Sequence, residues 1–177
     1  MKNISFRTFV PGTLAAVIVA LAASHALADD AAVNSSDKSF IQNAYEDGLA
    51  EVKMAEMAQG KTANADVKAF AEKMTTDHSQ ADSELKTLAD SKKVTVATSP
   101  TLTAQGKAKL LDARSGASFD KNYASDMVSD HKKAVALFEK TANEAKDPDV
   151  RAFANKILPT LREHLSMAEA LESKLGK

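Results

Sequence analysis

The chain has 177 residues, with 23 Lys and Arg, 24 Asp and Glu, and no cysteine. The absence of cysteine excludes disulfide bonds and thiol chemistry, so packing alone has to hold the fold together. The net charge of −1 at pH 7 and the mixing of both signs along the chain argue against a nucleic acid as partner, because nucleic-acid-binding domains present basic surfaces.

Residues 1–28 have the layout of a secretory signal peptide. Lys2 and Arg7 give a positive start, residues 8–24 are almost all apolar or small, and "HALADD" offers a cleavage site after Ala28. The apolar core at 14–23 is too short to span a bilayer, which needs roughly 20 apolar residues. We therefore expect a cleaved signal peptide and a periplasmic or otherwise exported protein.

Residues 29–177 are predicted to form a single all-α domain without a transmembrane span. This part is rich in Ala, Lys, Glu, Leu and Met, which are strong helix formers. Apolar residues recur with a 3.6-residue period in four long segments. These segments and their expected boundaries are a helix at about 37–59 ended by Gly60, a helix from the N-cap Asn64 to about 91, a helix with Ser118 as N-cap, and a helix with Asp147 as N-cap and Pro148 in its first turn.

The connection between the second and third long helices is unusually long. It starts with the β-rich stretch "SKKVTVATSP" and continues with a short predicted helix at about 103–114. Helix–helix connections in bundles typically have about 2–8 residues. A longer one fits the crossover of a ferritin-like four-helix bundle, which runs the length of the bundle. A simple up-down-up-down arrangement is the alternative.

Three histidines of the domain share one pattern. His78, His131 and His164 each belong to a different long helix, and each interrupts an apolar stripe where a core side chain is expected. Met74 and Met127 stand one turn before the first two. Each histidine also follows an acid directly, and these acids are Asp77, Asp130 and Glu163.

Glu51 adds a carboxylate to this set. It lies at the edge of the stripe that Gly48, Val52 and Ala55 form on the first helix, and counting from the helix ends puts it near the depth of the three histidines. An unpartnered buried polar group costs roughly 1–3 kcal/mol, so these four side chains need to satisfy one another. They can do so by hydrogen bonds among themselves.

A metal ion is the alternative way to satisfy the cluster. Three imidazoles and one carboxylate suit iron, copper or zinc, and the metal ligands would be Glu51, His78, His131 and His164. The sulfur atoms of Met74 and Met127 would favour Cu(I) as additional soft ligands. In the simpler interpretation, these methionines only fill the core.

Four stretches of the chain resemble a known family. They are "DGLAEVKMAEMA", "ADVKAFAEKMTTDH", "FDKNY" followed by "SDH", and "RAFANKILPTLREHL". They are similar to domain-of-unknown-function family 4142, exported bacterial proteins often described as predicted outer membrane proteins. The resemblance implies a ferritin-like four-helix bundle in which Glu51 and the three histidines occupy inward polar positions. It implies no activity, and the sequence has no signal for a lipid anchor or a barrel.

The chain departs from ferritins that bind two iron ions. Those proteins use Glu-x-x-His pairs, whereas Thr75, Val128 and Leu161 stand three residues before the histidines here. A ferroxidase centre of the usual kind is therefore not expected.

The sequence has no signature of a catalytic nucleophile, a phosphate-binding loop or a zinc finger, so it assigns neither catalytic nor cofactor-binding residues. We expect a non-enzymatic periplasmic or envelope protein, related to stress, with a buried His/Glu cluster. The first alternative is a metal-binding protein for storage, delivery or a redox step. The second is a module that presents helix surfaces to a protein partner.

Overall fold

The computed structural model describes residues 33–176, and every regular element in this part of the chain is a helix. The helices are α1 (Ser35–Lys61), α2 (Ala65–Ser91), α3 (Leu102–Asp112), α4 (Gly116–Glu144) and α5 (Pro148–Gly176). The all-α prediction is thus confirmed, while the predicted signal peptide at 1–28 lies outside the described residues. No helix of the described part is both long and apolar enough to cross a membrane.

Two of the predicted helix caps are confirmed. The side chain of Asn64 accepts hydrogen bonds from the backbone N–H groups of Asp66 and Val67 at the start of α2. Asp147 does the same for the first turn of α5, where Pro148 is the first helical residue. Short polar side chains hold these helix starts because they satisfy N–H groups that have no partner inside the helix.

Two other predicted boundaries are wrong. Ser118 is not an N-cap, because α4 already begins at Gly116, after Ser115. Gly116 has a φ of +52°, a conformation that glycine adopts without strain. The helix can therefore begin two residues before Ser118. Gly60 does not end the first helix either, since α1 continues to Lys61.

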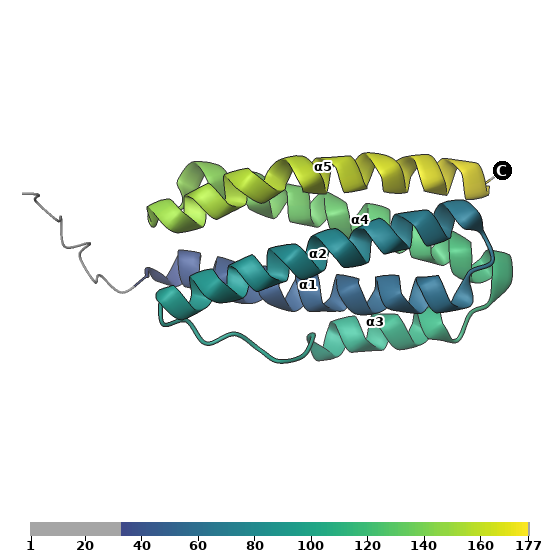
Figure 1. Cartoon of the computed structure of the whole chain (residues 1–177), viewed down its shortest axis with the longest axis horizontal. Coiled ribbons are helices and arrows are strands. Elements are labelled where there is room, and N and C mark those ends of the chain that lie inside the picture. Colours follow the sequence, from purple (N-terminus) through teal and green to yellow (C-terminus); the bar gives the residue numbers. More distant parts are fainter. Residues whose placement is uncertain (1–32, 177) are drawn as a thin grey trace, which may run out of the picture. The chain divides into compact units, whose positions relative to one another are not determined.

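The chain path is that of the predicted crossover bundle (Figure 1). Three-residue loops join α1 to α2 and α4 to α5, while residues 92–115 connect α2 to α4 and contain α3. Lys61 at the end of α1 pairs with Asp112 at the end of α3, and Lys92 after α2 pairs with Asp147 after α4, both at 2.7 Å. The C-terminal ends of α2 and α4 therefore lie at the same end of the bundle, which rules out the up-down-up-down alternative.

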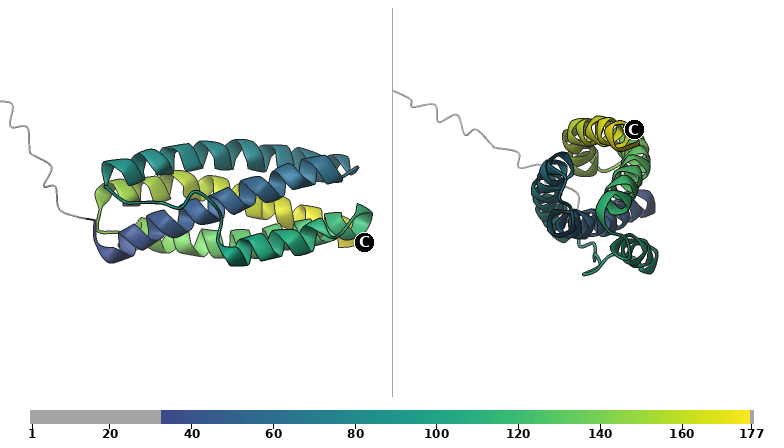
Figure 2. Two further views of the ribbon diagram at one scale, coloured as in Figure 1. Left: turned by 90° about the horizontal axis from the view of Figure 1, so that it is seen from below. Right: turned by 90° about the vertical axis from the view of Figure 1, so that its right-hand side faces the viewer.

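The end-on view in Figure 2 shows α1, α2, α4 and α5 around a common centre, with α3 outside them. The short helix packs on α1 and α4. The exposed large apolar side chains in the described part, Leu102 and Leu110, both belong to α3.

The interior of the bundle contains two apolar clusters separated along its length. The first, around Met74, Tyr123 and Met127, lies towards the α1–α2 turn. The second, around Leu85, Phe138 and Phe153, lies towards the α4–α5 turn. This division leaves the middle of the bundle for side chains of a different kind.

Candidate metal centre

A polar layer lies between the two apolar clusters, and it consists of the residues that the helical spacing singled out. Each of the four long helices contributes one member: Glu51 from α1, His78 from α2, His131 from α4 and His164 from α5. His131 and His164 are fully buried, and His78 and Glu51 are 6% and 7% exposed. The structure therefore brings all four candidate residues together in the core.

Glu51 lies deeper than its place at the edge of the apolar stripe suggested. It is buried, whereas the neighbouring Val52, expected to face inward, is only partly buried. Gly48 and Met54, one turn to either side of Glu51, are buried with it. Gly48 and Ala55 are buried as predicted, so the prediction is wrong only for Val52, and the inward face of α1 also includes Glu51, whose carboxylate contacts the histidines.

The three imidazole rings form a nearly equilateral triangle. The ring centroids are 5.6 Å apart for His78 and His131, 5.3 Å for His78 and His164, and 5.4 Å for His131 and His164. Each ring offers one nitrogen that lies within 4.8 Å of the nitrogens offered by the other two. This arrangement is compact enough for one ion to contact all three rings.

One nitrogen of each ring has an oxygen partner. His131 Nδ1 donates to the backbone carbonyl of Met127 at 3.0 Å, and His164 Nε2 donates to Asp77 Oδ2 at 2.8 Å. His78 Nδ1 lies 3.0 Å from Glu51 Oε2, while the other oxygen of Glu51 is 3.6 Å from His131 Nδ1. These contacts fix the orientation of each ring through the nitrogen on the outer side of the cluster.

The other nitrogen of each ring is buried and has no hydrogen-bond partner among residues 33–176. These atoms are His78 Nε2, His131 Nε2 and His164 Nδ1. Since a carbonyl oxygen can only accept, Nδ1 of His131 carries the proton and its Nε2 has a free lone pair. The same reasoning gives a free lone pair on His164 Nδ1, because Asp77 accepts from the opposite nitrogen.

Burial keeps these rings neutral. It lowers the pKa of His78 to about 4, and burial also lowers the pKa of His131 and of His164. Burial raises the pKa of Glu51 to about 7, partly opposed by His131. Neutral imidazole is the form that binds metal ions, so the rings are already in that form at neutral pH.

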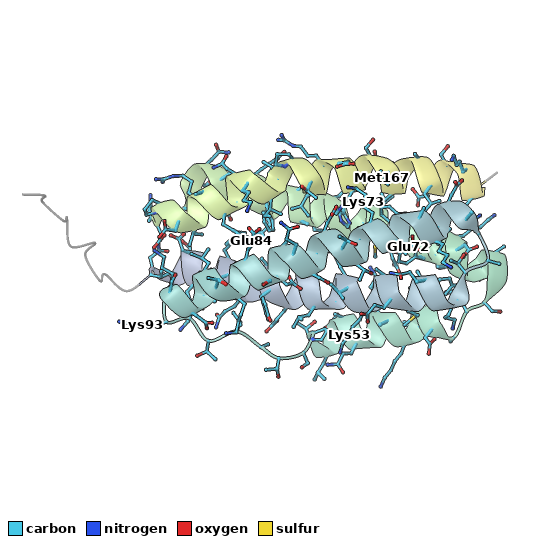
Figure 3. All side chains as sticks on the ribbon, viewed as in Figure 1. Lys53, Glu72, Lys73, Glu84, Lys93 and Met167 are labelled. Atoms are coloured by element: carbon cyan, nitrogen blue, oxygen red, sulfur yellow. The ribbon has the colours of Figure 1, made fainter. Side chains whose placement is uncertain are left out.

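The three acids that precede the histidines have different surroundings. Asp77 contacts His164 on α5 rather than its neighbour His78. Burial would raise the pKa of Asp77, but hydrogen bonds from His164 and Lys73 lower it overall. Lys73, labelled in Figure 3, also pairs at 3.4 Å with the exposed Glu163. Only Asp77 therefore supports the cluster directly.

Asp130 belongs to a separate ion-pair group. Its carboxylate accepts from Lys107 of α3 at 2.5 Å. Met74 and Met127 are fully buried in the first apolar cluster, and Met127 reaches the site through its carbonyl oxygen.

Asp82, which follows His78 by one turn on α2, is a member of the site that the sequence did not predict. Its carboxylate lies so close to Gly48 of α1 that a Cβ at position 48 would collide with it. Burial and the nearby Glu51 raise the pKa of Asp82 to about 7. The sequence does contain a sign of this contact. A small residue, Gly48, stands one turn before Glu51, and an acid, Asp82, stands one turn after His78.

Solved structures with this fold include DUF305 proteins and a copper-bound protein. A DUF305 fragment from Deinococcus radiodurans has a TM-score of 0.72 and 13% identity, covering 80% of this chain and 98% of that chain. CopM in its Cu(II)-bound and Cu(I)-bound forms has a TM-score of 0.66 and 19% identity, and each match covers 78% of this chain and 96% of the CopM chain. No curated protein matches the chain. The model of the family "Domain of unknown function (DUF4142)" matches residues 22–171, and the chain belongs to this family.

Proposed function

We propose that this protein binds one transition-metal ion through His78 Nε2, His131 Nε2 and His164 Nδ1. The observation that carries the proposal is that three neighbouring rings each have one buried nitrogen without a partner, and that one nitrogen of each ring lies within 4.8 Å of one nitrogen of each other ring. A buried polar atom without a partner costs roughly 1–3 kcal/mol. One ion would satisfy all three nitrogens at once.

The contacts on the outer side of the rings support this assignment. A metal-binding histidine usually donates its second ring N–H to a carboxylate or a backbone carbonyl, which orients the ring. Asp77 and the carbonyl of Met127 receive such bonds from His164 and His131. Glu51 stands in the equivalent place beside His78.

Glu51 therefore orients a metal ligand in this proposal and is not a ligand itself, in contrast to the ligand set that the sequence predicts. It contacts Nδ1 of His78 and approaches Nδ1 of His131, not their unpartnered nitrogens. Ionised Glu51 would hold the proton of His78 on Nδ1 and leave the lone pair on Nε2.

The fit requires a small contraction of the cluster. Metal–nitrogen bonds of about 2.0 Å place ligand nitrogens about 3.3–3.5 Å apart in tetrahedral or trigonal geometry. One nitrogen of each ring lies within 4.8 Å of one nitrogen of each other ring, so shifts of about 1 Å would bring three nitrogens to this spacing. Such shifts would come from rotation of the histidine side chains about χ1 and χ2.

Copper is the metal that we propose, with iron and zinc as the competing outcomes. Copper is the ion that the solved structures of CopM contain, on the same fold. Imidazole ligands suit copper, and the buried thioethers of Met74 and Met127 on one side of the layer suit its reduced form. Because three rings hold a single ion per chain, the proposed role is binding and delivery of copper in the exported compartment rather than bulk storage.

Metal analysis tests the proposal. Wild-type protein loaded with Cu(II), and separately with zinc or iron, is desalted and its metal content measured beside His131→Ala and the control Thr141→Ala. Thr141 is a buried polar residue of the same helix whose hydroxyl donates to Leu137. We expect about one copper per chain in wild type and in the control, and little in His131→Ala.

A stability measurement gives a second readout. Copper at a hundredfold excess over its dissociation constant should stabilise the folded wild type by about 2.7 kcal/mol. Equal copper content in wild type and His131→Ala, or no binding of any of the three metals, would refute the proposal and leave a hydrogen-bonded His/Glu layer.

A further inference from the structure

A cavity of about 610 Å³ adjoins the polar layer on one side. Its apolar wall includes Leu85, Phe138 and Phe153 of the second apolar cluster, and of the first cluster only Met54 reaches it. The cavity thus lies between the histidines and the second cluster. Its volume falls within the range of about 300–1,000 Å³ that is usual for small-molecule sites.

Two of the three histidine rings border this cavity. They are His78 and His164, each of which has an unpartnered, buried nitrogen. Met74 and Met127 of the opposite side are fully buried and do not line it. An ion held by the three rings would therefore have packed thioethers on one side and open space on the other.

We infer that this metal centre keeps a coordination position open towards the cavity, where it binds a small neutral molecule that has a nitrogen donor and an apolar body. The inference rests on the proposed function, because the open position exists only when the ion is bound. Three protein ligands and one exchangeable position are the arrangement of metal sites that bind external molecules, whereas purely structural sites are closed.

The charges near the centre favour a neutral molecule over an anion. Glu51 and Asp82 line the cavity, and their carboxylates, where ionised, would repel a negative ligand. The lysines that border the cavity already pair with other acids: Lys73 with Asp77, Lys107 and Lys133 with Asp130, and Lys156 with Glu84.

The apolar wall selects the body of the ligand. Phe138, Phe153 and Leu161 come from α4 and α5 and lie on the cavity side of the histidines. A phenyl group bound there would leave water for an apolar surface, which contributes about 25 cal/mol per Å². A planar nitrogen donor with one attached ring therefore matches both ends of the cavity.

Ligand titration of the copper-loaded protein tests the inference. The Cu(II) visible and electron paramagnetic resonance spectra are followed while 4-phenylimidazole, imidazole or azide is added. We expect 4-phenylimidazole to bind at least about tenfold more tightly than imidazole, and azide to bind most weakly. The copper content is measured before and after each titration, since the ligand should add to the centre without removing the ion.

Two variants fill the cavity from different helices, and one serves as control. Ala81→Phe on α2 and Ala134→Phe on α4 each place a ring where the ligand body would lie, and each should abolish the preference for 4-phenylimidazole while copper stays bound. Ala69→Phe on the exposed face of α2 should leave the preference unchanged. Circular dichroism checks that each variant is folded. If one of the two cavity-filling variants does not fold, the other still tests the inference.

The outcomes separate the two hypotheses. A wild type that holds no copper refutes the proposed function. A wild type that holds copper but shows no spectral change with 4-phenylimidazole, equal affinity for both imidazoles, or loss of copper during the titration refutes only the open position. Retention of the preference in a folded, filled variant also overturns it.

Discussion

Replacing Glu51 by glutamine should stabilise the metal-free protein at alkaline pH, although it removes a side chain that contacts two histidines. Glu51 is buried between His78 and His131, and burial raises its pKa from 4.5 to about 7. The folded state therefore holds the proton of this carboxyl more tightly than the unfolded state does. Glutamine has nearly the same shape and no charge to bury.

The size of the effect follows from the shift. One pKa unit corresponds to about 1.36 kcal/mol, so the ionised carboxylate lowers the free energy of unfolding by about 3 kcal/mol. This penalty is absent below pH 4.5, grows between pH 4.5 and 7, and is complete above pH 7. From about pH 5.5 to about pH 8.5 it increases by about 2 kcal/mol, which corresponds to roughly 4–8 °C in Tm.

The assay is urea denaturation of wild type and Glu51→Gln in the presence of a chelator at both pH values. The difference in unfolding free energy between Glu51→Gln and wild type should increase by about 2 kcal/mol from the lower to the higher pH. His78 has the opposite pH dependence, because burial lowers its pKa to about 4 and its contribution is lost as pH falls. Both proteins contain His78, so this contribution cancels. Glu56→Gln, on the exposed face of α1, is the charge-matched control and should show no such trend.

Adding copper should reduce the advantage in unfolding free energy that Glu51→Gln has over wild type at the higher pH. If Glu51 orients His78 for the metal, Glu51→Gln should bind copper about 10–100-fold more weakly than wild type. The reasoning would be refuted if the stability difference between the two metal-free proteins were the same at both pH values. Unchanged copper affinity would refute the orienting role of Glu51 alone.

Three further predictions concern contacts that do not involve the histidine side chains themselves. Asn64→Ala should lower the free energy of unfolding by about 1 kcal/mol, because α2 loses its N-cap; an unchanged urea midpoint would contradict this. Asp37→Ala should cost about 2–4 kcal/mol, because two backbone N–H groups of the α4–α5 turn lose their acceptor; Asp37→Asn should recover part of the loss in the same assay. Gly48→Ala should stabilise the protein by up to about 1 kcal/mol only in an Asp82→Ala background, since a Cβ at position 48 needs the space of that carboxylate. Equal effects in both backgrounds, measured as a double-mutant cycle, would argue against the contact.

Periodicity in the chain predicted the four long helices and the burial of each histidine, because a side chain's place on a helix face depends only on local spacing. Caps such as Asn64 and Asp147 were readable for the same reason, since they act on N–H groups two or three residues away. The wrong N-cap at Ser118 also has a local cause. Both Ser118 and Gly116 are compatible with a helix start, and the backbone conformation of Gly116 lets α4 begin before Ser118.

The long connection between α2 and α4 made the crossover the preferred arrangement, and the structure settled it through ion pairs at the two ends of the bundle. Loop length narrows the possible paths of a chain, but side-chain contacts between helix ends select one of them.

The sequence by itself determined that three histidines and Glu51 lie on inward helix faces, because helical spacing is a property of each segment alone. Only the tertiary structure decided which nitrogen of each ring is satisfied, that Asp77 of α2 supports His164 of α5, and that Asp82 fits against Gly48. The same holds for the cavity beside the rings. These features depend on the rotation and axial offset of one helix relative to another, which the packing of the whole bundle sets and no single segment encodes.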